Sequence, residues 1–207
     1  MSLFSAEDQQ RIADAITAAE QRTSGEIVAV VAAESSSYLH AAVLWAALAA
    51  LVVPLPLIYL TWWPIQWIYG LQLVVFAVLV ALLSWRPLRL ALVPRQVRQL
   101  RAHRRAVEQF LAQNLHTTAG RTGVMIFVSM AERYAEVLAD AGIHARVPHA
   151  EWQGIVDGLT EQIAKGHGAD GFVAAIGAIG GHLANHFPPG SRDPNELPNH
   201  LIILSGD

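Results

Sequence analysis

Residues 41–60 read AAVLWAALAALVVPLPLIYL, and residues 65–85 read IQWIYGLQLVVFAVLVALLSW. Both stretches lie in a run from Ser35 to Trp85 that contains no Asp, Glu, Lys or Arg. At about 1.5 Å of rise per residue, a helix of roughly 20 apolar residues crosses a hydrocarbon core of about 30 Å. Because only residues 61–64 separate the stretches, the sequence predicts a transmembrane hairpin. Its spans are expected at about 41–60 and 65–85, within a segment of 39–86.

Only the first predicted span contains proline, and both spans lack charged side chains. Pro54 and Pro56 predict a kink or local unwinding in the first span, because proline cannot donate a backbone hydrogen bond. Neither span contains Asp, Glu, Lys, Arg or His, and His40 lies at the boundary of the first. Pumps and channels usually carry polar groups inside the membrane, so the sequence disfavours transport through this hairpin.

Charge is distributed unevenly along the chain. Residues 86–105 contain seven arginines and no acid, whereas the remaining residues carry 7 basic and 17 acidic side chains. Arginines that directly follow a span mark the cytoplasmic side of a membrane. We therefore expect a multi-pass protein of the cell (inner) membrane with both termini in the cytoplasm. A helix capped by Ser5 and Asp8, rather than a signal peptide, is expected at the N-terminus.

The arginine-rich segment has two interpretations. It can serve only to set the topology, or it can also contact anionic headgroups of the lipid bilayer. Nucleic acid is disfavoured as a partner, because the rest of the domain is acidic and lacks interleaved aromatic residues. The arginines expected to contact lipid headgroups are those nearest the second span: Arg86, Arg89, Arg95 and Arg98.

The residues on either side of the hairpin together predict one α/β domain. The apolar, β-branched run Ile27–Ala33 indicates a strand buried on both faces, and Val124–Val128 indicates another. An amphipathic helix at about 94–114 lies between them in the sequence. A strand, a helix and a second strand form the parallel crossover unit, whose connection is right-handed.

Further elements complete the predicted fold. A third strand at 134–140 should pair antiparallel with the second at a sheet edge, and two helices should cover about 152–166 and 172–187. A loop and a short strand at 200–204 are expected within 188–207. We predict a three-layer α/β/α sandwich with a small mixed sheet, built from 1–38 and 87–187 and interrupted by the two-helix transmembrane hairpin.

Two smaller patterns occur on the last predicted helix. Gly177 and Gly181 are four residues apart and predict a close backbone approach, of that helix to the sheet or, as an alternative, of one subunit to another. His182 and His186 have a spacing compatible with a shared metal ion. Leu183 stands where a zinc protease motif requires Glu, so a polar helix end explains these histidines adequately.

Three carboxylates are the candidate catalytic and metal-binding residues. Glu34, Glu132 and Asp140 are expected near the ends of strands, with serines close in the sequence. Oxygen ligands of this kind suit Ca²⁺ or Mg²⁺, and phosphate hydrolysis needs a cation or backbone donors to offset developing charge. The alternative is that Glu132 caps a turn and Glu34 is solvated. The sequence contains neither a glycine-rich phosphate loop nor an EF-hand pattern.

Three motifs resemble the TPM-domain family: Thr23-Ser24-Gly25-Glu26-Ile27-Val28, Arg121-Thr122-Gly123-Val124-Met125-Ile126-Phe127-Val128-Ser129, and Asp170-Gly171-Phe172. The resemblance covers nearly all of residues 1–33 and 94–187. It implies an α/β/α sandwich. Some members of this family, notably relatives in the plant thylakoid lumen, are described as calcium-binding acid phosphatases involved in photosystem maintenance, and many bacterial members have no assigned activity.

Two functions follow as alternatives. The first is a membrane-anchored interaction or assembly module that acts on another membrane protein or forms a homo-oligomer. The second is an acid-phosphatase-like hydrolase that depends on a divalent metal and acts near the membrane surface; phosphatase activity is implied by the resemblance alone. The sequence shows no recognisable pair of nucleophile and base, which favours the interaction module.

Overall fold

The computed structural model describes residues 4–36, 39–118, 120–189 and 196–204, without the side chains of Arg86, Pro87, Arg89 and His149. The chain divides into two compact units. The first, which we call the α/β unit, combines Met1–Ser35 with Leu100–Asp207. The second, which we call the hairpin unit, is Ser36–Gln99. Each is described by itself.

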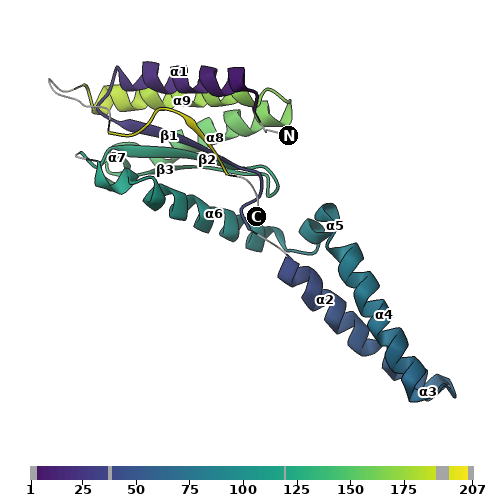
Figure 1. Ribbon diagram of the computed structural model, residues 1–207. Coiled ribbons are helices and arrows are strands. Elements are labelled where there is room, and N and C mark those ends of the chain that lie inside the picture. Colours follow the sequence, from purple (N-terminus) through teal and green to yellow (C-terminus); the bar gives the residue numbers. More distant parts are fainter. Residues whose placement is uncertain (1–3, 37–38, 119, 190–195, 205–207) are drawn as a thin grey trace. The chain divides into compact units, whose positions relative to one another are not determined.

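A four-stranded mixed sheet forms the centre of the α/β unit (Figure 1). Its strand order is β3-β2-β1-β4. Strand β1 pairs in parallel with both β2 and β4, whereas β3 pairs antiparallel with β2 and lies at the edge, as the sequence predicts. The strands are β1 (Glu26–Ala32), β2 (Gly123–Ser129), β3 (Tyr134–Ala139) and β4 (Leu201–Leu204).

The two central strands are buried along their whole length. Successive side chains of a strand point to opposite faces of a sheet. In β1, Ile27, Ala29 and Val31 therefore enter one hydrophobic cluster, while Val28 and Val30 enter the other. A sheet with apolar side chains on both faces needs a helical layer on each side, which is what the continuous apolar runs predict.

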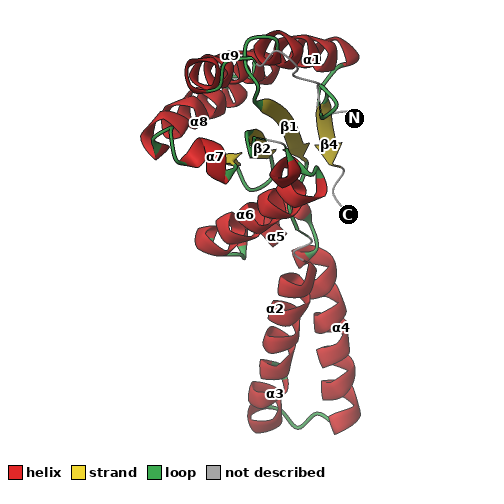
Figure 2. Ribbon diagram, turned by 90° about the vertical axis from the view of Figure 1, so that its left-hand side faces the viewer, coloured by secondary structure: helices red, strands yellow, loops and turns green. Residues whose placement is uncertain are grey.

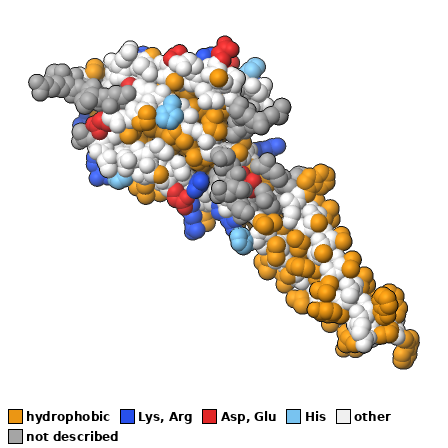
Figure 3. Space-filling view, in the orientation of Figure 1, with side chains coloured by type: hydrophobic (Ala, Val, Ile, Leu, Met, Phe, Trp, Pro, Cys, Tyr) orange, Lys and Arg blue, Asp and Glu red, His pale blue; other side chains and the backbone are white. Residues whose placement is uncertain are grey.

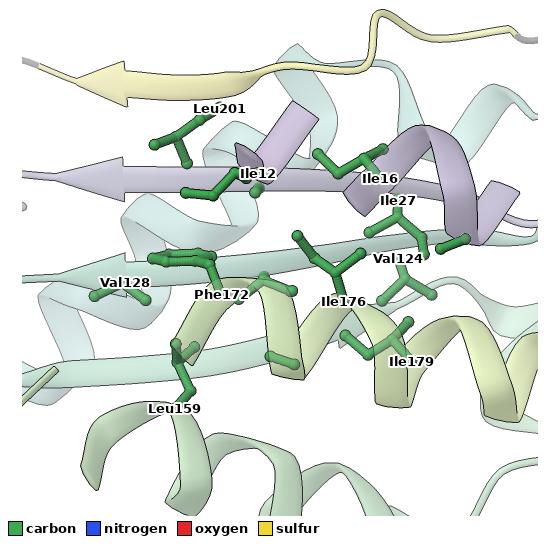
Figure 4. Packing of buried hydrophobic residues seen from close by; sticks show 14 of the residues in the cluster. Ile12, Ile16, Ile27, Val124, Val128, Leu159, Phe172, Ile176, Ile179 and Leu201 are labelled. Carbon is green, nitrogen blue, oxygen red and sulfur yellow. The ribbon is translucent and has the colours of Figure 1, made fainter. Parts of the chain in front are cut away.

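Helices cover both faces of the sheet (Figures 1 and 2). One layer contains α1, α8 and α9, and α6 covers the opposite face through Ala106 and Phe110. Figure 4 shows Phe172, Ile176 and Ile179 of α9 packed against the sheet. The elements are α1 (Ala6–Glu20), α6 (Arg95–Ala112), a 3-10 turn at Leu115–Thr117, α7 (Ala141–His144), α8 (His149–Ala164) and α9 (Gly168–His186). The three-layer α/β/α prediction is confirmed.

The hairpin unit consists of helices with apolar surfaces. Its elements are α2 (Leu39–Val52), α3 (Pro54–Leu60), α4 (Ile65–Leu83) and the short α5 (Arg86–Ala91). The break between α2 and α3 falls directly before Pro54, which confirms the predicted kink. Ala42, Ala46 and Ala50 are buried at intervals of four residues on α2, so small side chains allow α2 and α4 to approach closely.

Among the residues that the structure describes, two helical stretches are long and apolar enough to cross a membrane, Leu39–Leu60 and Ile65–Leu83. Only 17% of the first and 6% of the second are buried, so neither is a core helix of a globular protein. Hydrophobic side chains dominate their surface in Figure 3. Apolar surface of this extent is typical of a segment that contacts lipid.

Two details of the α/β unit differ from the sequence analysis. A Cβ atom added to Gly177 or Gly181 would meet nothing within 4 Å, so the predicted close approach of the sheet at these positions is wrong. Gly180 instead packs against α1, where an added Cβ would lie 2.8 Å from the Cβ of Ala19. The short helix α7 was not predicted, because four residues are too few to show a helical period.

Candidate functional site

The carboxyl ends of β1 and β2 meet at one edge of the sheet. Their parallel register pairs Ala32 with Ser129, so the residues that follow β1 reach the turn that follows β2. The backbone pairing continues past the strands: the N–H of Met130 donates to the carbonyl of Ala32 at 3.0 Å, and the N–H of Ala131 donates to that of Ala33 at 3.2 Å. In open α/β sheets, this is the edge at which ligands bind.

A buried hydrogen-bond network occupies this edge. The backbone N–H of Ser35 donates to both carboxylate oxygens of Glu132, at 3.1 and 3.2 Å. The Oγ of Ser35 donates to the Oγ of Ser129 at 2.7 Å, and the Oγ of Ser129 donates in turn to Oε2 of Glu132. All three residues are buried. We call this set of Ser35, Ser129 and Glu132 the edge network.

Two of the three candidate carboxylates lie at the carboxyl ends of β1 and β2. Glu132 belongs to the network, and Glu34 is buried directly before Ser35 at the same edge. The sequence interpretation in which Glu34 is solvated therefore does not hold. Glu132 closes the turn between β2 and β3, and its carboxylate also fixes the segment that leaves β1.

Asp140 does not join these carboxylates. Because β3 runs antiparallel to β2, its last residue, Ala139, lies beside Val124 at the start of β2. Asp140 is buried at that opposite edge, where it accepts hydrogen bonds from the Arg121 guanidinium at 3.2 Å and from the N–H of Ala141 at 2.6 Å. Asp140 therefore caps α7, and the expected grouping of three carboxylates is reduced to two.

A pocket of about 400 Å³ opens beside the edge network. Ser129 and Met130 contribute one wall, and Arg133 lies in the turn with a φ of 51°. Thr160 and Ala164 of α8 contribute another wall. The pocket therefore combines the buried hydroxyl of Ser129 with a cationic side chain and an apolar lining.

The candidate metal site is incomplete. Within the part of the chain that the structure describes, no group of three or more His, Asp or Glu side chains is arranged to hold a metal ion. Ca²⁺ needs six to eight oxygen ligands, and both oxygens of Glu132 already accept hydrogen bonds. His182 contacts Glu151 at 2.8 Å through Nδ1, rather than sharing an ion with His186. The His, Asp and Glu side chains of the described residues therefore do not by themselves form a complete Ca²⁺ site.

Sequence reasoning missed the pocket and a second polar cluster. No sequence motif marks the wall of the pocket that α8 contributes, because Thr160 cannot be distinguished in the sequence from other polar residues of an amphipathic helix. The second cluster joins α6 to β3: Nδ1 of His103 lies 2.9 Å from Oε2 of Glu136, and the hydroxyl of Tyr134 donates to the same oxygen at 2.8 Å. Burial, followed by the Glu136 carboxylate, raises the pKa of Tyr134 above its usual value.

The arginines expected at the lipid surface belong to two helices. Arg95 and Arg98 lie in the first turn of α6, and Arg95 is exposed. Arg86 and Arg89 fall in α5, and their side chains lie outside the described part of the structure. Whether any of the four contacts lipid stays a prediction.

The fold and this edge define a mixed α/β/α domain whose first strand is separated from the rest by a hairpin of two apolar helices. A family model described as the TPM domain matches residues 89–182. This match to residues 89–182 confirms the resemblance to the TPM-domain family seen in the motifs of the chain. The match begins after α4, whereas the structure adds α1 and β1 to the same layered unit.

One solved structure extends the comparison to nearly the whole chain. The NMR structure of BA42 protein from the psychrophilic bacterium Bizionia argentinensis is 21% identical, with a TM-score of 0.61. The similarity covers 99% of this chain and 97% of that one. At this identity the likeness concerns the fold alone. A search of curated proteins gives no match.

Proposed function

We propose that this protein is an integral membrane protein of the cell (inner) membrane that presents its TPM domain at the cytoplasmic surface as an interaction or assembly module. The observation that carries the proposal is the pair of apolar helices, Leu39–Leu60 and Ile65–Leu83, whose surfaces are almost entirely unburied. Lipid is the environment that accepts such surfaces at low cost.

The orientation follows from charge. Seven arginines lie within residues 86–105, directly after the second span, and the turn at 61–64 carries no charge to oppose them. Because arginine is costly to move across a bilayer, both termini are placed in the cytoplasm. The α/β unit, to which both flanks of the hairpin contribute, then faces the cytoplasm as a whole.

The chemistry of the edge supports an interaction module. The hydroxyls of Ser35 and Ser129 and the carboxylate of Glu132 form hydrogen bonds with one another, and a buried, mutually bonded network of this kind holds a backbone in place. The neighbouring pocket offers apolar walls and one arginine. A peptide side chain from another membrane protein, or from a second copy of this chain, suits these walls better than a phosphate ester does.

The second candidate is a divalent-metal-dependent hydrolase of the acid-phosphatase type. The name of the matching family model, TPM_phosphatase, favours it, as does the position of Ser129 in the wall of the pocket. In this alternative, Arg133 would contact the phosphate of a substrate at the membrane surface.

One pair of matched variants tests both candidates. Ala164 lies exposed at the pocket, and Ala145 lies exposed at the end of α7, so Ala164→Trp fills the pocket while Ala145→Trp adds the same surface at the opposite edge. Tagged full-length chains are purified from membranes in mild detergent after crosslinking. We expect a crosslinked partner or a second copy with the wild-type chain and with Ala145→Trp, and its loss with Ala164→Trp.

A phosphatase assay on the same preparations decides between the candidates. Hydrolysis of p-nitrophenyl phosphate that requires Ca²⁺ or Mg²⁺, and that Ala164→Trp abolishes while Ala145→Trp does not, would establish the hydrolase. Crosslinking that is the same in all three chains would contradict the interaction module.

A further inference from the structure

One face of α6 is apolar, yet it does not pack on the sheet. Val97, Leu100, Val107 and Leu111 are 38%, 51%, 37% and 51% exposed. Their spacing places them on the same side of the helix. The sheet side is formed by other residues, among them the fully buried Ala106. We call the four exposed residues the outer stripe of α6.

Positive charge flanks the outer stripe. Helix α6 carries one acidic residue, Glu108, which pairs with Arg105 at 3.3 Å. Figure 3 shows Lys and Arg side chains along the part of the surface that α6 forms. In the rest of the chain, acidic side chains outnumber basic ones, so α6 is opposite in charge to the domain that contains it. Its arginines are Arg95, Arg98, Arg101, Arg104 and Arg105.

We propose that α6 lies flat on the anionic lipid surface, with the outer stripe in the headgroup region and its arginines on lipid phosphates. This inference rests on the membrane anchoring proposed above. An apolar face bordered by arginines is the pattern of a helix that lies in the membrane interface. Each arginine near an anionic surface adds to the attraction between the helix and the lipid phosphates. Only eleven residues separate the end of α4 at Leu83 from the start of α6 at Arg95, so the helix begins close to the bilayer.

A second copy of the chain fits the outer stripe less well than an anionic lipid surface does. The stripe residues and Arg104 follow alternating intervals of three and four residues, which is the seam of a two-stranded coiled coil. Arg104 falls at the middle of this seam. In a parallel pair in register, and in an antiparallel pair centred on the stripe, Arg104 would face Arg104 of the other copy. A lipid phosphate instead neutralises this arginine.

The test measures how deep α6 lies. The chain contains no cysteine, so single cysteines in the full-length protein can carry one nitroxide label each. The labelled positions are Leu111→Cys at the far end of the stripe, Val74→Cys in the second span and Lys165→Cys after α8. The protein is reconstituted in phosphatidylcholine vesicles with and without phosphatidylglycerol. Collision with oxygen reports lipid, and collision with a water-soluble nickel complex reports water.

With phosphatidylglycerol, we expect the label at Leu111 to lose nickel accessibility and gain oxygen accessibility, while the label at Lys165 stays in water. Leu111 is the most informative position because it lies about 21 Å along the helix from Val97. If only the first turn of α6 contacted the membrane, the label at Leu111 would remain in water. Without phosphatidylglycerol, or with Arg104→Gln, the protection should decrease.

Each other outcome overturns the inference in a distinguishable way. A label at Val74 that remains in water removes the anchoring and this inference together. A label at Val74 in lipid with Leu111 in water removes only the inference. Protection of Leu111 that persists in detergent, with dipolar broadening between labels, shows that a second copy covers the stripe.

Discussion

At the scale of single residues, the motif glycines are explained by packing. A Cβ atom added to Gly123 would lie 2.6 Å from the carbonyl oxygen of Leu115, and one added to Gly25 would lie 2.9 Å from a methyl group of Leu183. Gly171 is similarly close to Gln162 of α8. The glycines of the motifs that carry the family resemblance therefore specify how helices and strands approach one another.

Gly123→Ala should destabilise the α/β unit by about 1–3 kcal/mol, because the backbone of Leu115 cannot move aside as a flexible side chain would. Gly177→Ala is the matched control. It adds the same methyl group on an exposed helical position with open space and should stabilise the protein by about 0.5–1 kcal/mol. Urea unfolding in mild detergent measures both, and a neutral Gly123→Ala would refute the packing explanation.

Glu20 gives the α/β unit a pH-dependent stability. Burial, with a smaller contribution from Glu26, raises the pKa of Glu20 from 4.5 to about 7, although its Oε1 accepts a hydrogen bond from the N–H of Ile27 at 2.8 Å. Between these two pH values the folded chain holds a proton that the unfolded chain releases. Stability from this group is therefore fully present below pH 4.5 and is lost as the pH rises through about 7.

Glu20→Gln should remove this dependence and stabilise the protein at pH 8, by about 1 kcal/mol once solvent screening of a partly exposed carboxylate is considered. Glu7→Gln, in the exposed first turn of the same helix, is the control and should leave the dependence unchanged. Urea midpoints at pH 5 and pH 8 report the effect. Wild-type and Glu20→Gln curves with the same change between these pH values would contradict it.

At the scale of elements, the clearest sequence signals were continuous apolar runs. The runs at Ile27–Ala33 and Val124–Val128 predicted β1 and β2 to within about a residue, because strands buried on both faces need apolar residues throughout. Asp140 shows what a linear sequence does not reveal: its position depends on the direction of β3, which reverses the edge at which the residue lies. The edge network joins Ser35 to Glu132 across 97 positions and has no local signal at all.

Packing inside the hairpin depends on the small residues of α2. Ala46→Leu should destabilise the contact between α2 and α4 by about 1–3 kcal/mol, because the alanine is fully buried there. Ala49→Leu adds the same side chain on the exposed side of α2, where detergent accepts it without cost. Thermal unfolding of the full chain in detergent should show a lower midpoint only for Ala46→Leu, and equal midpoints for both variants would show that the two helices do not pack in this way.

At the scale of the whole molecule, the hairpin unit is inserted within the sequence of the α/β unit, and this insertion limits the topologies that the chain can adopt. The α/β unit takes α1 and β1 from before the hairpin and its other described elements from after it. If the hairpin spans a membrane as proposed, the two flanks must lie on the same side of it for β1 to pair with β2. The proposed cytoplasmic interaction module and the membrane-lying α6 both require this topology. Charge alone decides which side it is.

The most direct test is the labelling of single cysteines in sealed membrane vesicles with a maleimide that does not cross the bilayer. Gln10→Cys in α1 and Lys165→Cys after α8 report the two flanks, and Thr61→Cys reports the turn between the spans. The account predicts that both flanks are labelled in inverted vesicles only and that the turn is labelled in right-side-out vesicles only. Labelling of Gln10→Cys and Lys165→Cys from opposite sides, or a chain that stays in the aqueous fraction without detergent, would contradict it.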